Sequence, residues 1–311
     1  MRQAAACRTL YTFGRNENAD FYAKNIKETP YGTEFSLYGK FYNGENLYTL
    51  DGGVEFVSAP LTIRTDEREF VDNADLDVLE MVDYLAKYKG KSGSACPGVG
   101  DWLDVFGDAD EVYCVTIIST LSGSYNAAMT AKAQYEEENP GKKVFVLDSY
   151  SAGPEPKLLI EKIRDLVLEG KDFETVCKEV LEYKEKRSCL LFSLESLRNL
   201  ANNGRTSHAV AALCSVVGIR LVGDVKDGLH PTDKCRGEKK AVATLYKNMK
   251  GKGYAGGTVV IDQCFNEPAA DALKAAIHSE FPDANVRIEK TSGLCSFYAE
   301  KGGLMIGFER G

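Results

Sequence analysis

The chain has 311 residues, of which 44% are hydrophobic and 27% are charged, and its formal net charge is −8. This composition is typical of a globular protein and excludes a disordered or fibrous chain, and the length predicts two domains or one large α/β unit. No apolar run approaches the roughly 18 residues of a membrane span, and the N-terminus lacks the apolar core of a signal peptide. We therefore expect a cytoplasmic protein without a transmembrane segment.

The charge is unevenly distributed along the chain. Residues 187–311 carry 17 Lys and Arg against 13 Asp and Glu, and residues 220–252 alone carry nine basic and four acidic residues. An acidic chain is a poor general binder of nucleic acid, so we expect no such partner. The basic stretch could face a phosphate or an acidic partner, although a solvated surface explains it more simply.

Nine cysteines are scattered along the chain without a CxxC pair, and the three histidines (His208, His230 and His278) lie far apart. Such a pattern indicates reduced thiols that serve mostly as small core residues, rather than disulfides or a zinc site. We expect neither a metal nor a cofactor.

The first 50 residues show no sustained hydrophobic period. They are rich in Tyr, Phe, Asn and Gly, and we expect an irregular N-terminal segment (1–50) with one or two strands near 34–42.

Residues 51–187 alternate strand and helix patterns. Strands are expected at 54–57, 61–64, 111–118 and 143–147. Helices are expected at 75–88 with Asp75 as the cap, and at 101–106, 124–138, 156–169 and 172–186; a Gly/Ser loop is expected at 91–100. This alternation predicts an α/β lobe with a mainly parallel sheet and right-handed crossovers.

Residues 188–311 predict a second, smaller α/β lobe. Its strands are expected at 189–192, 219–224, 229–232, 258–261, 285–290 and 302–308. Its helices are expected at 194–202, 207–216, 234–249 and 268–280.

Several enzyme signatures are absent from the sequence, among them G-x-S-x-G, H-E-x-x-H and the G-x-x-x-x-G-K-[ST] phosphate loop. Gly251, Gly253 and Gly256 match G-x-G-x-x-G, but they follow a predicted helix and precede a strand. A dinucleotide-binding loop has the opposite polarity, so we do not expect a nucleotide there.

The most informative segment is S-T-L-S-G-S-Y at 119–125, which joins a buried strand to a helix. Ligands of α/β proteins bind at the carboxyl ends of strands, and the N–H groups of a helix start favour an anion. Ser119, Ser122 and Ser124 would then bind a carboxylate or phosphate beside Gly123. The alternative is that Ser122 is only the helix N-cap.

A second hydroxyl-bearing segment, S-G-S-A-C-P at 92–97, precedes another predicted helix and could close over the same site. Alone it is a weak signal, because clusters of Ser, Gly and Pro usually mark a turn.

These segments resemble the DegV family, whose members bind fatty acids and carry them to a bacterial fatty acid kinase. The matching motifs are A-P-L-T-I at 59–63 (V-P-L-x-I in the family), S-A-C-P at 94–97 (T-S-Q-P), S-T-L-S-G-S-Y at 119–125 (S-K-L-S-G-T-Y), D-S at 148–149, L-R-N-L-A-N-N-G-R-T-S at 197–207 (L-x-x-L-x-x-G-G-R-I-S) and V-G-I-R at 217–220 (L-N-I-K). The resemblance covers residues 54–311.

The resemblance implies two α/β lobes (51–187 and 188–311) with a long-chain fatty acid in a buried tunnel between them. It implies that Ser94 and Ser122 bind the carboxylate, with Ser119, Gly123 and Ser124 beside them. Arg205 and Arg236 match arginines that surround the head group and dock on the kinase, although they could equally cap a turn and lie on a solvated surface.

The resemblance further implies a non-catalytic lipid-binding subunit without a cofactor. A partner kinase would phosphorylate the bound fatty acid, and the subunit would contact a membrane surface only transiently. The sequence departs from the family pattern at Tyr298, which stands where a histidine is usual, and it lacks a recognisable D-S of the first family strand. A tyrosine can donate a hydrogen bond there but cannot carry a proton near neutral pH.

The sequence is also compatible with two other functions. Ser122 could be the nucleophile of an acyl hydrolase or transferase, which would need an adjacent base. The segment could also bind another small anion, such as a phosphosugar, without any lipid.

Overall fold

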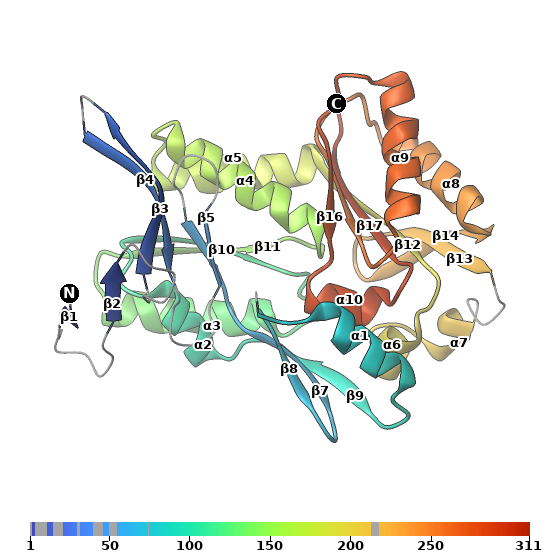
Figure 1. Ribbon diagram of the computed structural model, residues 1–311, viewed down its shortest axis with the longest axis horizontal. Helices are drawn as coiled ribbons and strands as arrows, with labels where there is room; N and C mark the ends of the chain where they lie inside the picture. The colour runs from blue at the N-terminus through green and yellow to red at the C-terminus, as the bar shows by residue number, and fades with distance from the viewer. Residues whose placement is uncertain are drawn as a thin grey trace. The chain divides into compact units, whose positions relative to one another are not determined.

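The computed structural model describes residues 2–3, 11–14, 21–29, 32–39, 46–49, 55–73, 75–212 and 218–311, with side chains from residue 56 onward in these ranges. The chain divides into two compact units (Figure 1). Unit 1 comprises Met1–Pro60 and Asn73–Asp75, and unit 2 comprises Leu61–Asp72 and Leu76–Gly311.

Unit 1 consists of strands. They are β1 (Arg2–Gln3), β2 (Tyr11–Gly14), β3 (Phe21–Thr29), β4 (Gly32–Gly39), β5 (Asn46–Thr49) and β6 (Glu55–Ser58). The first four form one sheet in the order β1-β2-β3-β4, and β5 pairs with β6. Five of these strands lie among residues 1–50, where we expected one or two; β4 covers 34–39 of the predicted 34–42, and 40–42 lie outside the described residues.

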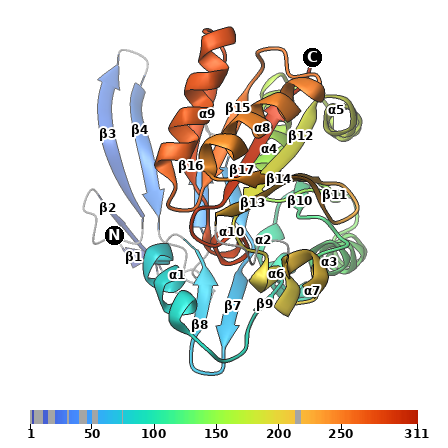
Figure 2. The same ribbon diagram turned by 90° about the vertical axis from the view of Figure 1, so that its right-hand side faces the viewer.

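Unit 2 begins with a three-stranded antiparallel sheet in the order β8-β7-β9 (Figure 2). Its strands are β7 (Leu61–Thr65), β8 (Glu69–Asp72) and β9 (Ser92–Ala95). Helix α1 (Val78–Lys87) connects β8 to β9, and its N-cap is Asp77, whose carboxylate accepts the N–H of Glu80 at 2.9 Å. The prediction of Asp75 as the cap was wrong, because the cap lies two residues later in the sequence than the hydrophobic period suggested.

The next part of unit 2 pairs two strands in parallel and carries four helices. Strand β10 (Glu111–Thr116) pairs with β11 (Lys143–Asp148). The helices are α2 (Val99–Phe106), α3 (Ser124–Glu138), α4 (Pro154–Leu168) and α5 (Phe173–Lys186). Apolar side chains of β11, α4 and α5 form one core cluster, which includes Leu147, Leu159 and Val176.

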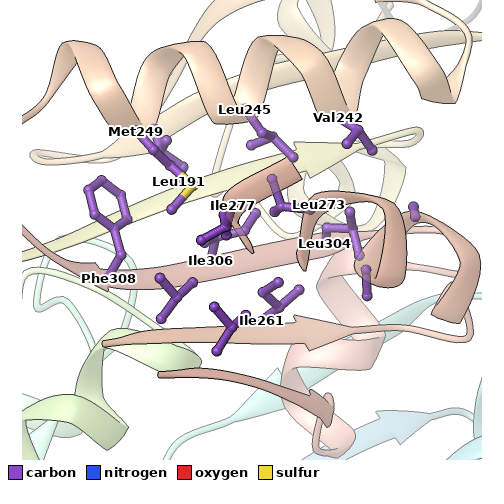
Figure 3. Close-up of a cluster of buried hydrophobic side chains, with 14 of the residues drawn as sticks. Leu191, Val242, Leu245, Met249, Ile261, Leu273, Ile277, Leu304, Ile306 and Phe308 are labelled. Carbon is purple, nitrogen blue, oxygen red and sulfur yellow. The ribbon is translucent and has the colours of Figure 1, made fainter. Parts of the chain in front are cut away.

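A six-stranded mixed sheet completes unit 2, in the order β14-β13-β12-β17-β15-β16. Its strands are β12 (Ser188–Leu194), β13 (Ile219–Val225), β14 (Leu229–Arg236), β15 (Val259–Gln263), β16 (Val286–Lys290) and β17 (Leu304–Glu309). Helices α8 (Glu238–Gly251) and α9 (Glu267–Glu280) cover one face, where Leu191, Leu245 and Ile306 meet in the largest core cluster (Figure 3). Helix α4 packs on the opposite face, so closely that a Cβ on Gly307 would lie 2.8 Å from the backbone of Pro154.

Three short helices lie near the site described below. They are α6 (Arg198–Asn202), α7 (His208–Ala211) and α10 (Gly293–Ala299). Helix α7 covers the start of the predicted helix at 207–216; residues 213–216 of that prediction lie outside the described residues. No helix in the described part of the chain is long and apolar enough to cross a membrane.

The α/β class is confirmed, but the prediction of a mainly parallel sheet in the first lobe was wrong. Between residues 61 and 187, β7 pairs antiparallel with both β8 and β9, and only β10 and β11 are parallel among the described strands. The turn between β7 and β8 is closed by a hydrogen bond from Thr65 N–H to Arg68 O of 2.8 Å. Such a short connection joins antiparallel strands, because a parallel pair needs a crossover of a dozen residues or more.

Two other local predictions were also wrong. Strand β9 occupies part of the predicted loop at 91–100, and residues 234–236 end strand β14 rather than opening a helix. Helix α10 was not predicted.

Candidate functional site

The serine-bearing segment at 119–124 follows strand β10 and is held by the neighbouring strand β11. The carboxylate of Asp148, the last residue of β11, accepts the N–H of Ser119 at 3.3 Å and the N–H of Tyr150 at 2.9 Å. Parallel strands end at the same edge of a sheet, and Asp148 therefore ties the two loops that leave this edge. Because Asp148 is 9% exposed, it fixes the start of the segment from inside the protein.

The serine hydroxyl groups at the start of helix α3 differ in how deeply they are buried. Gly123 occupies the N-cap position, so the alternative that Ser122 is only the N-cap is wrong. The Ser122 hydroxyl accepts the N–H of Ser124 at 3.2 Å and donates to the Ser124 hydroxyl at 3.2 Å. Ser124 is 4% exposed, whereas Ser119 and Ser122 are half-buried and Gly123 is exposed. Ser122 is thus the hydroxyl at the helix start that is both anchored and accessible.

The segment that contains Ser94 touches this helix start. A Cβ placed on Gly123 would lie 3.1 Å from the Sγ of Cys96, and one placed on Gly93 would lie 3.1 Å from Oδ1 of Asn203. Two glycines therefore allow strand β9 and its continuation to lie against both the α3 start and the loop after α6.

Ser94 and Tyr298 form the closest hydroxyl pair of the site. Their oxygens lie 2.7 Å apart, although the two residues are 204 positions apart in the sequence. The ring of Tyr298 packs against two apolar clusters, one around Phe192 and Leu200 and the other around Ile63 and Phe70. The hydroxyl pair therefore marks a polar point beside two apolar regions.

Arg205 connects three segments of the site. Its Nε donates to Leu121 O at 3.3 Å, and its guanidinium also donates to Asn203 O. The guanidinium carbon lies 5.9 Å from the centre of the Tyr298 ring, within range of a cation–π interaction. Arg205 thus both closes its own turn and places a positive charge beside Leu121 O and the Tyr298 ring.

The chain also matches a known protein family. The family model described as "Uncharacterised protein, DegV family" matches residues 53–310. The chain belongs to the DegV family. A DegV domain-containing protein of Streptococcus pneumoniae is 43% identical over 256 residues, which cover 82% of this chain and 91% of the relative.

Solved DegV structures share the fold. The DegV family protein of Eubacterium eligens, loaded with heptadecanoic acid, is 42% identical with a TM-score of 0.81, and the match covers 84% of this chain and 95% of that one. The Fatty Acid Kinase (Fak) B3 protein of Streptococcus pneumoniae, loaded with linoleic acid, is 43% identical with a TM-score of 0.81, and the match covers 83% and 92%.

Arg236 is the one predicted site residue of this DegV protein that lies apart from the cluster. It is exposed at the end of edge strand β14, opposite Ile219. The contacts described for it do not join it to the serines or to Tyr298. An exposed cation on an edge strand suits contact with another molecule better than contact with a buried ligand.

The DegV fold also contains a hollow of about 250 Å³ next to the residue before Tyr298. Val82, Leu85 and Phe297 give it an apolar wall, and Arg198 and Glu300 lie at its rim. A larger groove of about 740 Å³ between α4 and α5 is lined mostly by charged side chains. Neither hollow is lined by a predicted site residue.

The hydrogen bonds of Ser122 show which groups could activate it as a nucleophile. A nucleophilic serine needs a neighbouring base, but the hydrogen bonds described for Ser122 go only to Ser124. Of the three histidines, His278 contacts Ala284 O through Nε2 at 3.2 Å, and His208 and His230 are exposed. The contacts described for Ser122 therefore include no histidine that could serve as its base.

Proposed function

We propose that this DegV protein binds one long-chain fatty acid, with the carboxylate at Ser94, Ser122 and Tyr298 and the acyl chain in an apolar tunnel. The observation that carries the proposal is the Ser94–Tyr298 pair, two hydroxyls 2.7 Å apart beside two apolar clusters. A carboxylate withdrawn from water needs several donors to offset the loss of its hydration. Ser119, Gly123 and Ser124 shape the second side of this head-group site.

The acyl chain supplies the affinity and the hydroxyls supply the orientation. Burial of about 15 methylenes at ~0.8 kcal/mol each gives an upper limit near ~12 kcal/mol. Ordering of the chain and loss of its translational freedom lower this value substantially. Arg205, which belongs to the second proposed lobe (188–311), attracts the carboxylate through its positive charge.

The proposed ligand lies between the lobes formed by residues 51–187 and 188–311. Ser94 and Ser122 come from the first lobe, whereas Tyr298 and Arg205 come from the second. Contacts across this boundary, such as Ser94 with Tyr298 and Arg205 with Leu121 O, support the assignment. A carboxylate bound there would join the two lobes.

We further propose that the protein is a non-catalytic carrier in the cytoplasm, which presents the bound carboxylate to a separate kinase subunit. The sequence has no phosphate-binding loop of its own, and a relative of 43% identity is a Fatty Acid Kinase B3 protein. Arg236, exposed and apart from the head-group site, would dock on that kinase. Collection of the fatty acid would require only transient contact with a membrane surface.

Organic extraction of the purified full chain, followed by mass spectrometry, tests the proposal. We expect about one long-chain fatty acid per chain, retained through purification because apolar burial slows its release. The absence of lipid, together with no binding of added palmitate, would overturn the proposal. Recovery of a phosphosugar instead would identify a small-anion protein, and turnover of a long-chain ester abolished by Ser122→Ala would identify a hydrolase.

A further inference from the structure

Helix α10 is held at both ends by strands of one small sheet. At its N-terminus, the carboxylate of Asp72 accepts the N–H of Gly293 and the N–H of Leu294, each at 2.7 Å. At its other end, Tyr298 meets Ser94. Asp72 ends strand β8 and Ser94 lies on β9, with β7 between them (Figure 2). The sheet β8-β7-β9 thus fixes the helix that carries Tyr298 at two points.

The contact at Asp72 is tight. A Cβ placed on Gly293 would lie 2.8 Å from Oδ1 of Asp72 and 2.5 Å from Cδ2 of Leu76, so only glycine lets the helix start approach this closely. A carboxylate that accepts two N–H groups of a first helical turn also interacts favourably with the helix dipole. Burial raises the pKa of Asp72, and the two N–H groups oppose that effect.

The apolar contacts of α10 do not fix its position along its own axis. Phe297 packs in a cluster of apolar side chains that includes Ile63 and Met81. Such contacts are non-directional. The two hydrogen bonds at Asp72 are directional, and so is the bond that Asn199 Nδ2 donates to Phe297 O at 2.7 Å; those at Asp72 are the ones that hold the first turn of the helix. Gly293 and Tyr298 are five residues apart, about 7.5 Å along one rigid helix, so a shift at the N-terminus moves the Tyr298 hydroxyl as well.

We propose that Asp72 is a positioning residue for carboxylate recognition: by holding the first turn of α10, it sets the place of the Tyr298 hydroxyl beside Ser94. The inference rests on the proposed function, because it concerns the same head-group site. Asp72 itself does not touch the ligand. It acts through Tyr298.

A comparison of two ligands with the same chain tests this inference. Palmitic acid and 1-hexadecanol are titrated into delipidated full-length wild-type protein, Asp72→Asn, Tyr298→Phe and the double variant. We expect Asp72→Asn to weaken palmitate binding about tenfold, because a displaced Tyr298 loses its hydrogen bond to the charged carboxylate. Hexadecanol binding should change less than about twofold. The double variant should bind palmitate as weakly as Tyr298→Phe alone, because Asp72 acts only through Tyr298.

The matched control is Asp172→Asn. Asp172 caps helix α5 by accepting the N–H of Thr175 at 2.8 Å, so its loss costs stability without moving Tyr298. If Asp72→Asn does not fold, Gly293→Ala, which pushes the carboxylate away from the helix, is measured with the same expectations.

Equal losses for palmitate and hexadecanol, or losses that multiply in the double variant, would overturn the inference while the proposed function stands. Failure of the wild-type protein to bind palmitate would overturn both.

Discussion

Cys96 lies against Gly123: its Sγ is 3.1 Å from the place that a Cβ on the glycine would occupy. Gly123 has an ordinary φ of −74°, so glycine is needed here for space and not for an unusual backbone conformation. The contact joins the Ser94 segment to the start of α3, and thereby sets how far Ser94 lies from Ser122.

Gly123→Ala should therefore separate the two serine segments. We expect fatty-acid affinity to fall about fivefold and the free energy of unfolding to fall by about 1 kcal/mol, because an added methyl group overpacks the contact. Titration with palmitate and thermal unfolding measure the two effects. The control is Gly100→Ala in helix α2, where an added Cβ meets nothing within 4 Å; an equal loss of affinity in this variant would contradict the explanation.

Ser122→Ala should weaken palmitate binding by about one to two orders of magnitude, since a hydrogen bond to a charged group contributes about 1.5–3 kcal/mol. The matched control is Ser279→Ala, which removes a hydroxyl that only donates to Ala276 O on the exposed surface of α9. Unchanged binding in Ser122→Ala would remove this residue from the head-group site.

Arg236→Ala should leave palmitate affinity within about twofold of wild type but slow phosphorylation of the bound acid by a partner kinase about tenfold, because an exposed charge acts on the encounter with a partner. Lys290→Ala is the control. It removes one exposed positive charge from β16, the opposite edge of the same sheet. If both variants slow the kinase equally, net charge rather than docking at Arg236 explains the effect.

The sequence predicted most elements whose hydrophobic pattern is strong, such as β10 and β11. It missed β9 because Ser-Gly-Ser-Ala has little intrinsic preference for a strand. This segment becomes a strand through pairing with β7, where Ser94 lies opposite Ile63. The antiparallel pairing of β7 was missed because alternation of strands and helices does not reveal a tight turn such as that at Thr65.

The site could be predicted only in part, because some of its contacts join residues far apart in the sequence. The serines stand in a recognisable order with a glycine between them, and the family resemblance pointed to Tyr298. The residues that hold these groups in place, Asp72 and Cys96, contact partners far away in the sequence; Asp72 and Gly293 are 221 positions apart. No local pattern encodes a contact of that length.

A buried carboxyl group offers a test of how α4 is held on the six-stranded sheet. Asp262 on β15 is 2% exposed and pairs with Lys157 of α4 at 2.8 Å. Lys157 also pairs with Glu289 of β16 at 2.8 Å. Burial outweighs the attraction of Lys157 and raises the pKa of Asp262 from 3.8 to about 6.

Because its pKa is raised on folding, Asp262 binds a proton more readily in the folded state. Its contribution to stability is therefore complete below pH ~4 and is lost as the pH rises through ~6. The Asn side chain in Asp262→Asn does not titrate, so the unfolding free energy of wild type minus that of the variant should fall by up to about 3 kcal/mol between pH ~4 and ~7. Thermal unfolding followed by circular dichroism across this range measures the difference. Asp172→Asn should show no such fall in this range, because the N–H of Thr175 lowers the pKa of Asp172 and its contribution is lost only as the pH drops below about 4. A rising difference for Asp262→Asn would mean that Lys157 keeps Asp262 charged despite its burial.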